Sequence, residues 1–242
     1  MTGTWEGFLT VVFDMYPSKT IPCCITLQAE YLPNFIDQVE KIATDSEKAN
    51  RVFIGIEKKI SHEALYNAYY TFLSNEKQKE ILLLQYLYQG FEIGPQWNHM
   101  LGVDCVRKVN EIRKKVFGEC HRLKGLVRFE QIGPNLYYSS IHPDHRIIEP
   151  LGQHFIQRLS IQNFILHDQN RKLAFLYNTK EYQIIENITL KELTRTKEEK
   201  EYQKLWQAFF KTIAIPERKN PRLQLGYMPR RYWQDLIEKP ES

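Results

Sequence analysis

Apolar side chains recur every three or four residues through most of the first half of the chain, which is the period of an amphipathic helix. The opening stretch follows this rule, with Phe8, Val11 and Met15 on one side. Asp45 and Ser46 can cap one helix and Ser61 can start another, and each start is followed by apolar residues at helical spacing. The pattern therefore predicts an opening helix and two further helices that begin near these caps.

The nearly all-apolar run within residues 76–88 predicts a central helix, which Gly94 and Pro95 end. A further helix is expected over 95–117. One exception to the helical pattern precedes them, because residues 22–27 (PCCITL) form a short apolar run that predicts a strand.

The period changes after Gly125, where apolar residues gather in short runs separated by turn signals such as Gly133-Pro134-Asn135. Four strands and one helix follow from this pattern, and Pro150 suits the first turn of that helix. The predicted elements are strands over 126–131 and 136–141, a helix from Pro150, and strands over 163–167 and 172–177. This order predicts a small antiparallel ββαββ unit.

The last section returns to helical spacing over 197–213, and its prolines then impose an extended crossing. Pro229 can start a final helix. Trp206, Phe209 and Trp233 lie at helical spacing, so they are expected to be core residues rather than exposed rings.

The fold class is therefore predicted as α+β, with a helical N-terminal half, the ββαββ unit and a C-terminal helical basic segment. The corresponding regions are 1–120, 121–190 and 191–242, packed as separate parts or as one integrated domain. A chain of 242 residues can bury a substantial core. No apolar run approaches the roughly 20 residues that span a bilayer, and the four cysteines lack metal-type spacing. We therefore expect a reduced, soluble, cytoplasmic protein with no membrane partner.

Positive charge is concentrated near the carboxyl end. The whole chain has a formal net charge of +4, whereas the stretch 211–231 holds six basic residues and one acid, which gives +5. Such a cationic stretch beside aromatic residues suits a polyanion such as DNA. The alternative is that the arginines pair with carboxylates and only fasten the fold. The candidate phosphate-binding residues are Lys211, Arg218, Lys219, Arg222, Arg230 and Arg231.

A second basic group, Lys124 and Arg128, flanks Gly125 where the helical half meets the strands. Glycine lets a backbone approach a ligand closely, and the two cations could hold phosphate. The same residues also fit a basic helix C-terminus that complements the helix dipole, and the sequence favours this second interpretation.

Histidines and acids gather between residues 142 and 168. These residue types serve acid–base chemistry near neutral pH or hold divalent metals. One group follows the second predicted strand and the other ends the third, so the two groups could meet. Their spacing matches no metal motif, and structural roles in turns remain the alternative. The candidate catalytic residues are His142, Asp144, His145, His167 and Asp168.

Three stretches together resemble a bacterial family described as DNA metabolism or DNA repair proteins with a domain of unknown function. They are ECHRLKGLVRFE (119–130), the segment from LYYSSIHPDHRIIEP to FLYN (136–178) and LWQAFFKTIAIPERKNPRLQLGYMPRRYW (205–233). The resemblance implies DNA as a ligand and a radical-SAM DNA repair protein as a partner. A uracil-DNA-glycosylase-like protein is a further implied partner, because some members are fused to such a domain.

This chain departs from that family at residue 142, where His142-Pro143-Asp144-His145 stands in place of an expected Glu-Pro-Asp-His. The chain also lacks the CxxxCxxC, GxxxxGK[ST] and GxSxG motifs, and no cofactor is predicted. Three functions stay open: a DNA-binding accessory protein, a DNA-processing enzyme that uses the histidine–aspartate group, and a protein-interaction scaffold.

Overall fold

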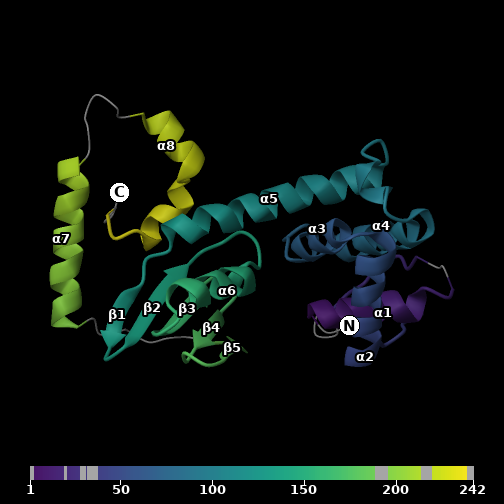
Figure 1. The fold of residues 1–242 in the computed structure, drawn as a ribbon, viewed down its shortest axis with the longest axis horizontal. Helices are drawn as coiled ribbons and strands as arrows, with labels where there is room; N and C mark the ends of the chain where they lie inside the picture. The colour runs from purple at the N-terminus through teal and green to yellow at the C-terminus, as the bar shows by residue number, and fades with distance from the viewer. Residues whose placement is uncertain are drawn as a thin grey trace. The chain divides into compact units, whose positions relative to one another are not determined.

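The computed structural model describes residues 3–18, 21–27, 31, 38–188, 196–213 and 220–238. The chain divides into two compact units, 1–117 and 118–242 (Figure 1). The fold is α+β, with a helical first half and a five-stranded, mostly antiparallel sheet in the second unit, which confirms the predicted fold class.

The first unit is built from helices. Three of them begin at side-chain caps: Thr4 accepts from the Gly7 amide, Asp45 from Glu47 and Ser61 from Ala64. The elements are α1 (Trp5–Met15), α2 (Ser46–Gly55), a π-helical turn (Ile56–Ile60), α3 (His62–Phe72), α4 (Lys79–Ile93), a 3₁₀ turn (Trp97–His99) and the start of α5 (Asp104–Leu126).

Aromatic side chains fill much of the core of this unit. Trp5, Phe8 and Phe72 pack together with ring centroids 5.3–5.7 Å apart. Trp97 is fully buried against α4, where a β-carbon at Gly90 would lie 2.8 Å from its ring. Close packing of this kind explains why α4 is apolar on nearly all sides.

Two predictions in this unit are wrong. Residues 22–27 form no strand, and three of the six are exposed while none is buried, so the short apolar run lies outside the core. The helix expected over 95–117 begins only at Asp104 and continues to Leu126. The Gly-Pro break is instead followed by the short 3₁₀ turn that carries Trp97.

The second unit contains a sheet in the order β1-β2-β3-β4-β5. The strands are β1 (Glu130–Gly133), β2 (Leu136–Ile141), β3 (Asn163–Asp168), β4 (Leu173–Tyr177) and β5 (Tyr182–Glu186). Helix α6 (Ile148–Arg158) lies over β3 and β4, where Gly152 allows the Phe175 ring to approach closely (Figure 1).

The sheet differs from the predicted ββαββ unit in two details. Strands β2 and β3 are parallel, because the chain crosses through α6 between them and re-enters the sheet in the same direction. The other three neighbouring pairs are antiparallel. Strand β5 was not predicted, since its sequence YQIIE lies at an edge and is mostly exposed.

Two helices and a 3₁₀ turn complete the unit. They are α7 (Lys197–Ile213), α8 (Pro221–Tyr227) and η4 (Arg230–Asp235). Helix α8 forms in part of the segment after residue 213 that was expected to be extended because of its prolines. The side chain of Asn220 caps this helix. The final helix expected after Pro229 is the 3₁₀ turn η4. Among the helices of the described residues, none has the length and apolar character needed to cross a membrane.

Candidate functional site

The buried carboxylate of Glu119 organises the segment that follows β2. It lies in the second-unit part of α5 and is 1% exposed. Its two oxygens accept hydrogen bonds from the backbone amides of Asp144 and His145, both at 2.9 Å. The hydroxyl of Tyr232 in η4 donates to the same carboxylate at 2.6 Å. A single side chain therefore joins α5, the loop 142–147 and the C-terminal turn.

Arg231 belongs to the same cluster. Its Nη2 lies 2.9 Å from a carboxylate oxygen of Asp144 and 3.6 Å from Glu119, and it donates to the Tyr232 hydroxyl at 2.9 Å. Burial, aided by the hydrogen bond to Glu119, raises the pKa of Tyr232 to about 12. The charge of Arg231 is thus compensated within the fold.

Arg128 is also paired with an acid. Its Nη2 lies 2.6 Å from Glu238, whose side chain is 1% exposed, and the indole of Trp206 donates to the same carboxylate at 3.2 Å. Burial alone would raise the pKa of Glu238, but the hydrogen bonds from Arg128 and Trp206 lower it. Arg128 also donates to the carbonyls of Gly125 and Val127, so it acts as a helix C-terminal cap.

Arg222 on α8 and Arg230 at the start of η4 differ from these two arginines. Both are exposed, and neither guanidinium forms an ion pair within the described ranges. Arg230 instead lies 5.9 Å from the ring of Trp233. Arg222 lines an open hollow of about 490 Å³ together with Asn220, Leu223, Gly226 and Tyr227. Among the described residues these two side chains therefore carry positive charge without a carboxylate partner, and each lies beside an aromatic ring.

Aromatic rings are exposed in the same part of the chain. Trp206 and Phe209 were expected to be core residues, but they are 41% and 54% exposed, so that prediction is wrong for both. Tyr202 on α7 and Tyr227 on α8 are 71% and 72% exposed. Trp233 is half-buried and donates to the Met228 carbonyl. Helical spacing placed the α7 rings on one stripe, but Tyr202 and Phe209 of that stripe are mostly exposed, and Trp206 is partly exposed beside Arg128 and Glu238.

The remaining predicted cations are placed only in part. Lys124 lies in the last turn of α5 and is half-buried. Arg218 and Lys219 lie outside the described residues, and so does the side chain of Lys211.

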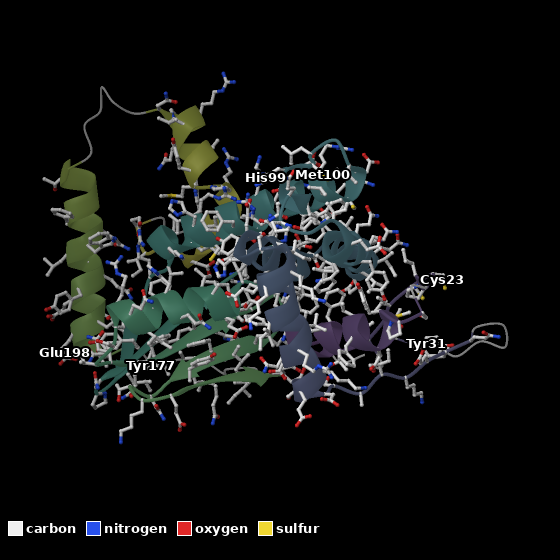
Figure 2. The ribbon with its side chains drawn as sticks, turned by 45° about the vertical axis from the view of Figure 1, so that its right-hand side comes forward. Cys23, Tyr31, His99, Met100, Tyr177 and Glu198 are labelled. Atoms are coloured by element: carbon white, nitrogen blue, oxygen red, sulfur yellow. The ribbon has the colours of Figure 1, made fainter. Side chains whose placement is uncertain are left out.

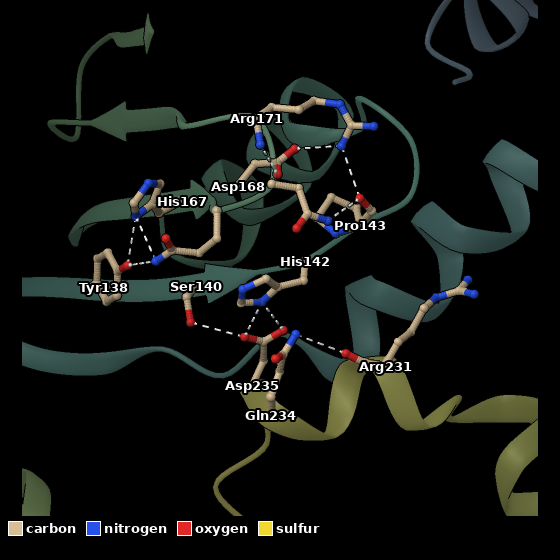
Figure 3. A network of polar contacts seen from close by, with 12 residues as sticks. Tyr138, Ser140, His142, Pro143, His167, Asp168, Arg171, Arg231, Gln234 and Asp235 are labelled. Carbon is tan, nitrogen blue, oxygen red and sulfur yellow. Dashed lines mark hydrogen bonds and ion pairs between the residues drawn. The ribbon is translucent and has the colours of Figure 1, made fainter. Parts of the chain in front are cut away.

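The ends of β2 and β3 bring part of the histidine–aspartate group together, because these two strands are adjacent and parallel. His142 follows β2 and faces Asp235 of η4 (Figure 3). Its Nδ1 lies 2.9 and 3.1 Å from the two carboxylate oxygens, and the Ser140 hydroxyl donates to one of them at 3.2 Å. The hydrogen bond to Asp235 raises the pKa of His142.

His167 on β3 makes a separate contact. Its Nδ1 lies 2.9 Å from the Tyr138 hydroxyl and 3.2 Å from the amide nitrogen of Gln169 (Figure 3). It is 2% exposed, and burial lowers its pKa, which keeps the ring neutral near pH 7. This histidine is a buried hydrogen-bonding residue of the sheet.

Asp168 closes the turn between β3 and β4. Its carboxylate accepts from the Arg171 backbone amide and lies 3.2 Å from the Arg171 guanidinium, which also donates to the carbonyls of Pro143 and Asp144. Burial raises the pKa of Asp168 despite this cation. Asp144 pairs with Arg231, and His145 is half-buried with its amide bound by Glu119. Asp168, Asp144 and His145 therefore hold the loop after β2 in place.

Sequence reasoning missed the partners that organise this region: Glu119, Asp235, Tyr232, Glu238 and Arg171. Each contacts at least one residue more than 25 positions away along the chain, and no local sequence pattern identifies such a contact. Across the described ranges, no cluster of three or more His, Cys, Asp or Glu side chains is arranged to hold a metal ion. All four cysteines are thiols, and Cys23 is exposed (Figure 2).

Comparisons with known proteins give one match. A search of curated proteins finds no significant relative, and a search of solved structures finds none either. The family model that matches is described as a domain of unknown function, DUF4130, and it covers residues 77–238, which include all of the sheet and the contacts of Glu119 and Asp235. The chain therefore belongs to the DUF4130 family.

Proposed function

We propose that the protein binds DNA through the exposed cations and rings of its C-terminal segment, as an accessory to a partner enzyme in DNA repair. The observation that carries the proposal is the pair Arg222 and Arg230, which are exposed and have no carboxylate partner among the described residues. Phosphate contacts by such arginines release counterions and supply much of the affinity for nucleic acid. The exposed ring of Tyr227 adds a surface for a base.

The partner is a radical-SAM protein, with a uracil-DNA-glycosylase-like protein as a second one. This part of the proposal is supported by the family resemblance of the stretches 119–130, 136–178 and 205–233. The same resemblance supports a bacterial setting, and the cysteines, which are few and have no disulfide-type or metal-type spacing, support a cytoplasmic one.

A salt titration tests DNA binding. Fluorescence anisotropy of a labelled oligonucleotide would be measured from 50 to 200 mM salt, for the wild type and for Arg222→Gln/Arg230→Gln. Loss of two phosphate contacts should reduce the slope of log affinity against log salt by about 1.4–1.8. Lys58→Gln/Lys59→Gln is the matched control, because it removes the same charge from exposed positions of the first unit.

Equal slopes for the arginine variant and the wild type would remove these arginines from the interface. A wild type that shows no salt-dependent binding, but copurifies with a radical-SAM protein, would favour the scaffold function instead.

The His142–Asp235 pair supports a second candidate, a DNA-processing enzyme. A carboxylate that holds Nδ1 of a partly exposed histidine leaves Nε2 to exchange a proton, which is the arrangement of an oriented acid or base. Incubation with single-stranded and uracil-containing oligonucleotides should then give cleavage or base release that His142→Gln abolishes. His99→Gln, an exposed histidine of the first unit, is the control. No turnover by the wild type would reject this candidate.

A further inference from the structure

The hollow on α8 combines three features that a nucleotide needs. Arg222 supplies a cation for a phosphate, and Tyr227 supplies an exposed ring. Gly226 lies between them, and a β-carbon at this position would meet no atom within 4 Å, so its backbone is open to a ligand. Positions 222 and 226 share one side of the helix, and so do 223 and 227.

The distribution of rings favours one kind of nucleic acid. Tyr227, Tyr202 and Phe209 are the most exposed aromatic side chains of the described residues, and all three lie on α7 or α8. A protein ring can stack only on a base whose face is uncovered, and bases inside a duplex are covered by their neighbours. An exposed ring beside an arginine that has no carboxylate partner among the described residues therefore suits a strand whose bases are unstacked.

We infer that the α8 hollow, lined by Asn220, Arg222, Leu223, Gly226 and Tyr227, binds one unstacked base and its phosphate, so that the protein prefers single-stranded to duplex DNA. This inference rests on the proposed DNA binding and narrows it to a substrate class. Tyr227 stacks on the base and Arg222 contacts the phosphate. Gly226 leaves room for the ring of the nucleotide to lie against the helix.

The test compares a labelled 12-residue oligothymidylate with a duplex of the same length and charge per strand. Tyr227→Ala should weaken single-strand binding by about 5- to 150-fold, the usual effect of removing a stacking ring. Its effect on duplex binding should stay below about twofold, because a duplex gains nothing from that ring. Tyr227→Phe keeps the aromatic face and should bind like the wild type.

A second pair of variants tests the hollow itself. Gly226→Leu places a branched side chain in the space of the base and should weaken single-strand binding, whereas Gly226→Ala should leave it nearly unchanged. Because Gly226 and Tyr227 are both exposed, each variant should unfold at the wild-type temperature, which a thermal melt checks.

Four outcomes would overturn the inference. Equal affinity of the wild type for single strand and duplex, or equal losses for both in Tyr227→Ala, would reject it and leave DNA binding intact. An unchanged affinity in both Tyr227→Ala and Gly226→Leu would do the same. Absence of salt-dependent binding to either oligonucleotide, with tight binding of poly-glutamate, would reject DNA binding as well and assign the surface to an acidic protein.

Discussion

At the scale of single residues, the arginines of the second unit fall into two kinds. The guanidinium groups of Arg128 and Arg231 form ion pairs with Glu238 and Glu119, whose side chains are 1% exposed. Arg222 and Arg230 are exposed to solvent and have no such partner among the described residues. A buried carboxylate that loses its cation stays desolvated and uncompensated, so Arg128 and Arg231 contribute to the stability of the fold. Arg222 and Arg230 can bind a ligand without any loss of folding stability.

Replacement of Arg128 by Met should therefore lower the free energy of unfolding by about 3 kcal/mol, because Glu238 is left buried without its cation. Urea denaturation measures this loss. Arg222→Met is the matched control and should change stability by less than about 0.5 kcal/mol, as exposed substitutions usually do. Equal effects of the two variants would contradict this division.

The hydrogen bonds of Glu119 give a second residue-scale prediction. Glu119→Gln replaces one accepting oxygen with a donor that faces a backbone amide of the loop, so we expect a loss of about 2 kcal/mol. Tyr232→Phe removes only a hydroxyl donor and should cost about 1 kcal/mol. Chemical denaturation of both variants checks the order, which a larger loss in Tyr232→Phe would contradict.

The contribution of the His142–Asp235 contact to folding stability depends on pH. A raised pKa in the folded state means that the native protein binds the proton more tightly. The stabilisation is complete below the ordinary histidine pKa of about 6.5 and is lost as pH rises through the raised pKa of His142. An NMR titration of the wild type should show this raised value, and Asp235→Asn should return it toward the ordinary one. Identical titrations would contradict the role of Asp235.

At the scale of elements, the hydrophobic period of the sequence predicted the helices and strands that bury one face. Helix α1 follows from its apolar spacing, α2 and α3 follow from caps and spacing, and β2 follows from its run of apolar residues. Strand β5 was missed because an exposed edge strand has no apolar face to mark it. The α7 rings were assigned to the core because spacing defines a stripe but does not say what covers it.

The packing of α6 on the sheet depends on a glycine. A β-carbon at Gly152 would lie 2.4 Å from the Phe175 ring, so Gly152→Ala should lower stability by about 2 kcal/mol despite the better helix propensity of alanine. Gly125→Ala in the last turn of α5 meets no atom within 4 Å and should be neutral or stabilising. Thermal melts compare the two, and a neutral Gly152→Ala would show that the helix can shift.

At the scale of the whole molecule, the charge pattern predicted a basic carboxyl end but not which cations have carboxylate partners among the described residues and which have none. Ion pairs such as Arg128–Glu238 join residues 110 positions apart, and only the fold brings them together. The meeting of the β2 and β3 ends could be anticipated from strand order, whereas the Asp235 partner of His142 could not. Composition thus suggests the class of the proposed ligand, and tertiary contacts decide which cationic side chains are available to bind it.

The carboxylate of Glu119 also limits how the basic end can be dissected. Truncation of the chain before Tyr232 would remove the phenol that donates a hydrogen bond to the Glu119 carboxylate. The backbone amides of Asp144 and His145 would then be bound by a side chain that is itself held less firmly. If such a truncated protein failed to bind oligonucleotides, the loss of binding would have two explanations, misfolding and removal of the binding surface. Single exchanges at outward-pointing positions of α8 are accordingly the way to locate the ligand.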